Sequence, residues 1–465
     1  MSRDPIQTMH RAASVIMAST GEPSIEKATE RLRALRVQVI LGPTAISSAA
    51  LQAAALTIVN AGKRTFAGGV YVSGMSTGAT RTRLSTLPEF ADAIRAAGGD
   101  IVHEAVADVP AIVLGVPAVP PRGLPLVLRM EVEGWKAVVS PFDEAPMLGG
   151  GFALALAGVF GGALALSEVF AFVLQLHDDA GHRQTGLSLW ELDPTADLRH
   201  SPSGPDIKYW PSKLWLIGLG QLGQAILWSL ASLEYQDAAD VEIMLQDWDA
   251  VGEENHSTGL LIETASIGQQ KTRVADQWLA ARGFRTRLVE RWFVSGGAIQ
   301  PTDPSVLLVG VDSGAVRAEI ARATAKALSG FTHIDVGLGS TASDFDDIVL
   351  HAAPFRTLVT EGWDTAAARM AAKTAAAVEN DAIRAIGDAN GLDACGMVRF
   401  AQISTGVPYV GTAAGTVAVA EILRRLSGAP PLSTVSARLR DLARGLAPRI
   451  AITATAPIEF TPRVY

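Results

Sequence analysis

A short apolar run that ends in three spaced glycines constrains this 465-residue chain more than any other feature. Residues 214–217 read LWLI, and Gly218, Gly220 and Gly223 follow with the spacing GxGxxG. A buried strand, a tight turn and the start of a helix fit this order, because glycine allows the turn and lets an anion approach the helix amides. The spacing therefore predicts a Rossmann-like unit with a phosphate-binding turn.

The segment after the turn continues the same pattern. We expect a helix at residues 221–233 and a second strand at residues 241–245, and Asp247 follows that strand. An acid at this place can bind the hydroxyls of a ribose. Together these features predict a dinucleotide or ATP site, and the alternative is a Rossmann-like unit that binds no nucleotide.

A dense series of polar residues after the acid distinguishes between the two nucleotides, because a nicotinamide enzyme needs nothing particular there. The chain reads Gln246-Asp247-Trp248-Asp249-Ala250-Val251, then Asn255, then Ile267-Gly268-Gln269-Gln270-Lys271, then Gly310-Val311-Asp312 and Arg317. This series resembles the ThiF/MoeB/ubiquitin-activating-enzyme (E1-like) superfamily, whose pattern runs D-x-D-x-V, an Asn, an Arg-Gln pair, a lysine, and a strand that ends in an Asp with an Arg after it. The resemblance covers about residues 214–428.

The resemblance implies an adenylyltransferase that uses ATP and Mg²⁺ to activate a C-terminal carboxylate. Its protein substrate would be a ubiquitin-like or sulfur-carrier protein or a peptide. The chemistry suits these residue types, because pyrophosphate leaves as the anhydride forms and its charge must be met by fixed cations and a metal. The implied roles are ribose binding for Asp247 with Asp249 beside it, phosphate contact for Asn255, contact with the β- and γ-phosphates for Lys271, magnesium binding for Asp312, and support of that acid or of the phosphates for Arg317.

Simpler structural roles compete with two of these assignments. Lys271 opens an amphipathic helix, and the alternative to a functional role is a solvated lysine; for Asp312 the alternative is the cap of the helix that carries Arg317. The chain also departs from the family pattern, because Thr258 stands where the family has an arginine near the triphosphate. A hydroxyl does not imitate a guanidinium on phosphate. Either another arginine substitutes or the site binds nucleotide without turning it over. The resemblance implies that such an arginine arrives from the N-terminal helix of a partner subunit, for which the candidates are Arg31, Arg33 and Arg36.

Cys395 is the single cysteine of the chain and its one possible thiol nucleophile. The resemblance implies a catalytic cysteine between the magnesium acid and the last helix, in the Ala-rich and charged region 361–399, which we expect to be helical in part. A buried, inert thiol is the alternative. Three further acids, at positions 344, 346 and 347, are interpreted as a solvated loop rather than as a second metal site.

The first third of the chain repeats the pattern faintly. Residues 37–42 are again an apolar run that ends in glycine, and we expect a helix at residues 45–60 and a strand at residues 69–72. Residues 112–115 parallel 306–310, and residues 163–170 parallel 416–423, with one glutamate at the same place in each of the last pair. The later glycines and the terminal acid are missing from this copy, which therefore reads as a degenerate domain. An unrelated α/β domain is the alternative.

The predicted fold is α/β, with two Rossmann-like doubly wound domains in a pseudo-symmetric pair, of which the C-terminal one binds the nucleotide. The predicted division is an N-terminal segment at 1–30, the degenerate domain at 31–185, a linker at 186–210, the ATP-binding domain at 211–430 and a C-terminal extension at 431–465. A hydrophobic content of 48% and a mean hydropathy of +0.24 agree with large buried sheets.

Composition also restricts the partners and the compartment. The net charge of −8 and the lack of a basic cluster argue against a nucleic-acid binder. The apolar residues 149–174 contain Ser167 and Glu168 and several glycines, so we expect a buried helix rather than a membrane span. With no signal peptide apparent, we expect a cytoplasmic protein. A homodimer is one assembly that the sequence allows. Two rival functions remain, a non-catalytic nucleotide-binding scaffold and an NAD(P)-dependent oxidoreductase.

Overall fold

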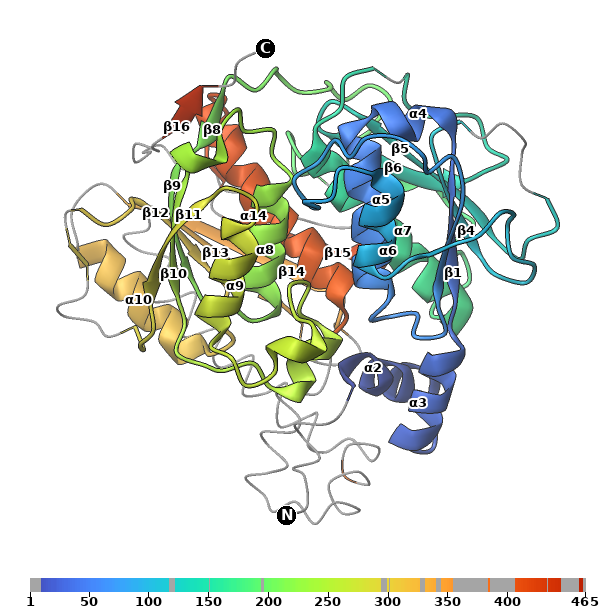
Figure 1. The fold of residues 1–465 in the computed structure, drawn as a ribbon, viewed down its shortest axis with the longest axis horizontal. Helices are drawn as coiled ribbons and strands as arrows, with labels where there is room; N and C mark the ends of the chain where they lie inside the picture. The colour runs from blue at the N-terminus through green and yellow to red at the C-terminus, as the bar shows by residue number, and fades with distance from the viewer. Residues whose placement is uncertain are drawn as a thin grey trace.

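The computed structural model contains two lobes, each built on a seven-stranded sheet (Figure 1). The residues that it describes are 10–116, 122–149, 151–193, 196–293, 299–300, 302–326, 331–339, 344–353, 384, 406–432, 434–444 and 460–462. The predicted pair of Rossmann-like domains is confirmed, because both sheets are mixed and are covered by helices that follow their strands.

The first lobe has the strand order β3-β2-β1-β4-β5-β6-β7. Strands β1 to β5 are parallel, and β6 and β7 add antiparallel to the edge beyond β5. The strands are β1 (Val37–Leu41), β2 (Val70–Gly74), β3 (Asp100–Ile101), β4 (Ala111–Leu114), β5 (Val127–Glu133), β6 (Lys136–Pro141) and β7 (Thr185–Ser188). The helices are α2 (Arg11–Thr20), α3 (Ile25–Ala34), α4 (Pro43–Ser47), α5 (Ala49–Gly62), α6 (Phe90–Ala97) and α7 (Ala155–Leu174).

The second lobe repeats this order strand for strand as β11-β10-β9-β12-β13-β14-β15, again with the last two strands antiparallel. Its strands are β9 (Lys213–Ile217), β10 (Glu242–Gln246), β11 (Arg285–Val289), β12 (Val306–Val309), β13 (Thr332–Leu338), β14 (Asp347–Ala353) and β15 (Thr434–Arg438). Its helices are α8 (Gln221–Ala231), α9 (Lys271–Ala280), α10 (Gly314–Lys326) and α14 (Pro408–Leu426), with short 3₁₀ turns η1 (Ala238–Asp240), η2 (Glu253–Ser257), η3 (Thr264–Ser266) and η4 (Leu439–Arg444). A separate pair joins β8 (Tyr209–Pro211) to β16 (Phe460–Pro462).

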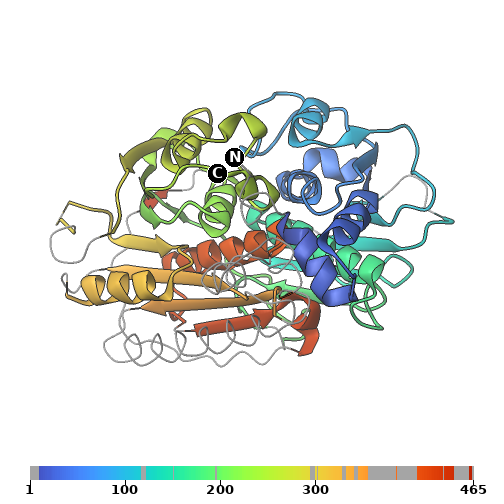
Figure 2. The same cartoon turned by 90° about the horizontal axis from the view of Figure 1, so that it is seen from below.

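Four helices lie between the two sheets and join the lobes into one core. In Figures 1 and 2, α5 and α7 of the first lobe face α8 and α14 of the second, and one cluster of buried side chains runs through all four helices. Trp228 on α8 donates a 3.0 Å hydrogen bond to Thr57 on α5, and the rings of Phe170 and Tyr409 lie 5.7 Å apart. The lobes are therefore packed together like the inside of a single domain.

The matched glutamates of the two halves occupy equivalent helices. Glu168 and Glu421 each lie 13 positions after the first residue of their helix, α7 or α14 (168 − 155 and 421 − 408), and both are fully buried. Each carboxylate is neutralised by arginine, Glu168 by Arg183 and Glu421 by Arg424 and Arg425. The pairing explains how an acid is accommodated inside these apolar helices. Within the described residues, α7 is the helix long and apolar enough to cross a membrane, but it is buried in the core, as predicted.

Several local predictions were wrong. The helix expected at 45–60 is broken at Ser48, whose hydroxyl caps α5 by accepting from the Leu51 amide at 3.2 Å, and the strand expected at 69–72 is Val70–Gly74. The predicted linker contacts the first lobe, because Trp135 hydrogen-bonds the carbonyls of Ser203 and Pro205. The acids at 346 and 347 are not a solvated loop: Asp346 is 1% exposed and ion-paired with Arg440, and Asp347 is paired with Arg438.

Candidate functional site

The glycine turn lies where the topology of the second sheet reverses. The chain runs from β9 outward to β10 and β11, and then returns to place β12 on the other side of β9. The amide of Gly310, directly after β12, donates to the carbonyl of Ile217 at the end of β9, at 2.9 Å. In open parallel sheets ligands bind in the crevice at such a switch point, beyond the carboxyl ends of the strands.

The three glycines of the turn have three different reasons to be glycine. Gly218 has a φ of +87°, which side chains rarely adopt, and a Cβ on Gly223 would lie 2.0 Å from the carbonyl oxygen of Gly218. A Cβ on Gly220 would meet nothing within 4 Å. Gly218 and Gly223 thus shape the turn, whereas Gly220 borders open space above the first amides of α8, where an anion is favoured.

Asp247 is bound to the turn itself. One carboxylate oxygen accepts from the Leu219 amide at 2.7 Å, and the other accepts from the Asp249 amide at 2.8 Å. The acid that follows β10 therefore orders both the glycine turn and the start of its own loop. The sequence placed Asp247 beside the turn, but it gave no indication of these two bonds.

Lys271 and Asp249 form an ion pair at the start of α9. Their Nζ and Oδ2 atoms are 2.9 Å apart, the lysine side chain is 11% exposed, and the Lys271 amide also donates to the Asp249 carbonyl. Lys271 is the first residue of α9, as predicted, but it is not a freely solvated lysine. Asn255 lies in η2, where its side-chain oxygen accepts from the Gly252 amide at 2.9 Å.

Asp312 and Arg317, the two site residues predicted after β12, lie in different environments. Asp312 is exposed at the strand end. Arg317 is buried in α10, where it is ion-paired with Asp335 of β13 and donates to the Val336 carbonyl at 2.9 Å. Burial raises the pKa of Asp335 to about 7, although Arg317 acts in the opposite direction. The structure thus brings Asp312 to the same end of the sheet as the turn and places Arg317 against β13.

Arg11, which the sequence analysis did not propose, lies at this site. Its helix α2 contacts η2, and a Cβ on Gly406 would lie 3.8 Å from Arg11 Cδ and 3.7 Å from Thr258 Cγ2. Arg11 thus lies near Thr258, the residue that replaces the family arginine. Burial lowers the pKa of Arg11, whereas the nearby carboxylates of Glu254 and Asp312 raise it. Of the three candidates that the resemblance implies from a partner subunit, Arg31 pairs with Glu22 of its own chain, and Arg33 and Arg36 are exposed.

Two buried polar atoms near Arg11 and Thr258 are consistent with the binding of phosphate together with a metal ion. Arg11 Nε and Glu254 Oε2 are both buried, and neither has a hydrogen-bond partner among the described residues. Buried polar atoms are normally paired, so such atoms indicate a missing partner. No group of three or more potential metal ligands is found in the described part of the chain. Asp312 would therefore need phosphate oxygens and water to complete a magnesium site, which is the usual way proteins bind this ion.

The equivalent turn in the first lobe carries different residues. A Cβ on Gly42, which follows β1, would lie 2.2 Å from the Val116 carbonyl oxygen, and the Thr44 hydroxyl accepts from the Val116 amide at 3.3 Å. Continuing the register of β1 and β2 beyond Leu41 and Gly74 puts Met75 where the second lobe has Asp247. The first copy keeps the sheet, but it has Thr44 where the second lobe has Gly220 and Met75 where the second lobe has the acid.

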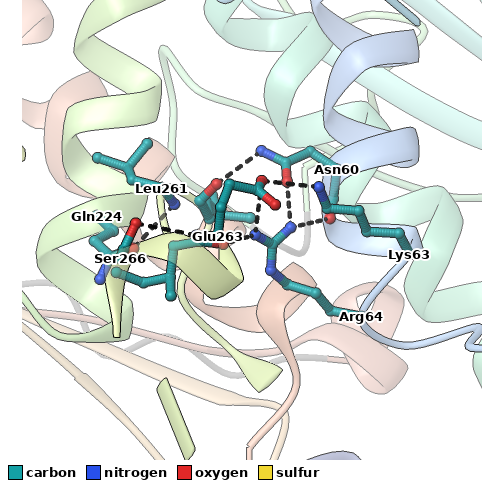
Figure 3. Close-up of polar contacts among 9 residues, drawn as sticks. Asn60, Lys63, Arg64, Gln224, Leu261, Glu263 and Ser266 are labelled. Carbon is teal, nitrogen blue, oxygen red and sulfur yellow. Dashed lines mark hydrogen bonds and ion pairs between the residues drawn. The ribbon is translucent and has the colours of Figure 1, made fainter. Parts of the chain in front are cut away.

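The first lobe nevertheless contacts the loop that joins Asn255 to Lys271 (Figure 3). From the end of α5, Asn60 donates to the Leu260 carbonyl at 3.0 Å and Arg64 to the Ile262 carbonyl at 2.6 Å. Gln224 of α8 continues the connection: it accepts from the Leu261 amide at 2.9 Å and donates to the Leu219 carbonyl at 3.0 Å. We name Asn60, Arg64 and Gln224, with residues 260–262, the inter-lobe clamp. It links the first lobe to the glycine turn.

Two segments predicted to matter lie outside the described residues. These are Cys395 and the region 361–399 around it, of which the structure describes position 384 alone.

Comparison with known proteins gives a consistent result along the chain. A family model described as the BilD C-terminal domain matches residues 210–429, and one described as the BilD N-terminal domain matches residues 36–189. The bacterial E1-like protein BilD of Collimonas sp. (strain OK412) is 34% identical to this chain over 443 residues, which is 94% of this chain and 93% of that protein.

Proposed function

Because this chain belongs to the family of bacterial E1-like BilD proteins, we propose that its second lobe binds MgATP and adenylates the C-terminal carboxylate of a ubiquitin-like protein or a related small protein or peptide. The family membership supports an E1-like adenylation fold. The residues at the glycine turn support the finer proposal, of which the nucleotide, the metal and the substrate are all parts.

The observation that carries the proposal is the place of Arg11. An adenylation site without an arginine at the triphosphate lacks a cation that the leaving pyrophosphate needs. In this chain Thr258 takes the expected position in the sequence, and Arg11 lies beside it in space with a buried, unpaired Nε. The guanidinium thus compensates for the substitution at position 258.

The remaining residues divide the work as follows. The amides at the start of α8 would bind phosphate above Gly220, and Asp247 would bind ribose while it holds the turn. Asp249 keeps the Lys271 ammonium in place for the outer phosphates, and Asp312 would bind magnesium together with phosphate oxygens. A carboxylate oxygen of the substrate then attacks the α-phosphorus, the bond to the bridging oxygen breaks, and pyrophosphate leaves with the electron pair.

The experiment is calorimetric titration of the full chain with ATP, with and without magnesium, and with NAD. We expect magnesium-dependent ATP binding that Asp312→Ala abolishes, whereas Asp240→Ala, an exposed acid at η1 on the opposite end of β10, leaves it unchanged. NAD binding, or no binding of ATP, would overturn the proposal.

Turnover is tested separately by release of pyrophosphate in the presence of a ubiquitin-like protein that ends in a free carboxylate, with the same protein amidated at its C-terminus as the control. ATP binding without pyrophosphate release across such substrates favours the non-catalytic scaffold, for which Thr258 is the supporting observation.

A further inference from the structure

Two exposed tryptophans stack on each other beside the candidate nucleotide site. The rings of Trp248 and Trp292 have centroids 4.5 Å apart and planes tilted by 25°. The residues are 47% and 53% exposed. Large aromatic surface left in water on a packed protein usually marks a binding site. None of the roles described above uses these rings.

The pair is held in place by buried neighbours. Gln246, which is 2% exposed, accepts from Trp215 Nε1 at 3.1 Å and donates to the Arg291 carbonyl at 3.2 Å, so it fixes the residue before Trp292. Phe293, the residue after it, packs in the core with its ring centroid 6.1 Å from that of Trp215. Since both flanking residues are anchored, the outward position of Trp292 is built into the loop.

The order of the strands indicates what the pair would bind. The glycine turn follows β9, Asp247 follows β10, and Trp292 follows β11, the next strand of the sheet. A nucleotide with phosphate at the turn and ribose at Asp247 extends along this edge, so its base reaches the loops after β10 and β11. Trp248 directly follows the ribose acid, and the ring of Trp292 stacks on that of Trp248.

We propose that the stacked pair is a platform for a purine base, with the base on the outer face of Trp248 and Trp292 supporting it from behind. The inference rests on the proposed nucleotide function and adds the base subsite to it. The rings of the pair already contact each other, so the base stacks on the outside rather than between them. Stacking contacts the flat face of the base and none of its hydrogen-bonding edges. ATP and GTP should therefore bind with similar affinity, and UTP, with its smaller base, should bind more weakly.

The test compares ATP with inorganic tripolyphosphate, both with magnesium, by calorimetric titration of the full chain. Trp248→Ala is expected to weaken ATP binding about tenfold and to leave tripolyphosphate binding unchanged, because stacking on one aromatic ring contributes roughly this factor. Trp248→Phe keeps a flat ring and retains most of the affinity. Trp292→Ala gives a smaller loss. Phe152→Ala, at an equally exposed aromatic residue of the first lobe, serves as the matched control and leaves both affinities unchanged.

The outcomes separate the platform from the proposed function. If the wild-type chain binds ATP and Trp248→Ala binds it equally well, the platform is wrong and the nucleotide site stands. If Trp248→Ala weakens tripolyphosphate as much as ATP, the ring supports the loop and does not bind the base, so the platform is again wrong. If the wild-type chain binds neither ligand, both proposals fall. Circular dichroism of each variant verifies that it is folded.

Discussion

The carboxylate of Asp247 accepts a 2.7 Å hydrogen bond from the amide of Leu219, so the acid at the end of β10 holds the turn at the end of β9. A ribose-binding acid needs only to face the ligand, whereas this one also fixes the glycine loop. Binding of the sugar and the shape of the phosphate turn therefore depend on the same carboxylate.

Asp247→Ala should lose nucleotide binding and also stability. The change leaves two amides, those of Leu219 and Asp249, without their acceptor, which costs about 1–3 kcal/mol for each group that stays out of contact with water. Denaturant unfolding gives the free energy and calorimetry the affinity. An unchanged free energy of unfolding would contradict the double role, and Asp240→Ala provides the comparison.

Two glycine substitutions should distinguish a residue that shapes the turn, Gly223, from one that borders the bound phosphate, Gly220. Gly223→Ala forces a Cβ to 2.0 Å from the Gly218 carbonyl, so we expect a loss of at least about 2 kcal/mol in the free energy of unfolding. Gly220→Ala meets no atom within 4 Å, so the melting temperature should change little while ATP affinity falls. Equal melting temperatures for the two variants would show that the turn differs from the one described.

Arg11→Ala should weaken ATP binding at least tenfold, because it removes a charged partner of the phosphates worth about 1.5–3 kcal/mol. Arg11→Lys should recover only part, since an ammonium does not reproduce the planar fork of a guanidinium. Arg33→Ala on α3, an exposed arginine of the neighbouring helix, is the matched control. If Arg11→Ala binds ATP like the wild type, another residue compensates for Thr258.

Lowering the pH should reduce the stability of the protein through His10, next to α2. Burial first and the neighbouring His256 second lower the pKa of His10, the residue before α2, from 6.5 to about 4. The folded state keeps this ring neutral, while the unfolded chain takes up a proton near pH 6.5, so stability is lost as the pH falls from 6.5 toward 4. Unfolding measured across this range should show a shallower slope for His10→Gln, with a difference of about 3 kcal/mol at pH 4. Parallel slopes would mean that His10 is solvated.

The contact between the lobes should depend on the buried arginine of the inter-lobe clamp rather than on the neighbouring surface ion pair of Lys63 and Glu263. Arg64→Met removes the buried donor to Ile262 and should cost about 2–4 kcal/mol of unfolding free energy. Lys63→Ala removes an ion pair with Glu263, whose side chain is 61% exposed, and should cost less than about 1 kcal/mol. Similar costs for the two variants would refute this ranking.

The sequence was sufficient wherever a feature depends on neighbouring residues. The glycine spacing, the apolar strand before it and the helix start at Lys271 are local patterns, and their elements end within about two residues of the predicted positions. The two lobes were also recognisable, because their strands and their last helices repeat in the same order.

Contacts between distant segments could not be predicted in this way. Arg11 reaches the site from a helix more than two hundred positions before Thr258, and nothing around it in the sequence marks it. The pairing of Arg317 with Asp335 depends on how α10 packs on β13, which spacing alone does not give. The break at Ser48 was missed because a hydroxyl that caps a helix is also tolerated inside one.

The four helices between the sheets give the first lobe a structural role that does not depend on the residues at its strand ends. That lobe has Thr44 and Met75 in place of Gly220 and Asp247, yet α5 and α7 still cover α8 and α14, so the second lobe produced alone would expose this apolar face to water. The helical surface of the first lobe must therefore match that of the second, whatever residues its own strand-end loops carry. A substitution on that surface would first appear as poor solubility, far from any residue that touches a substrate.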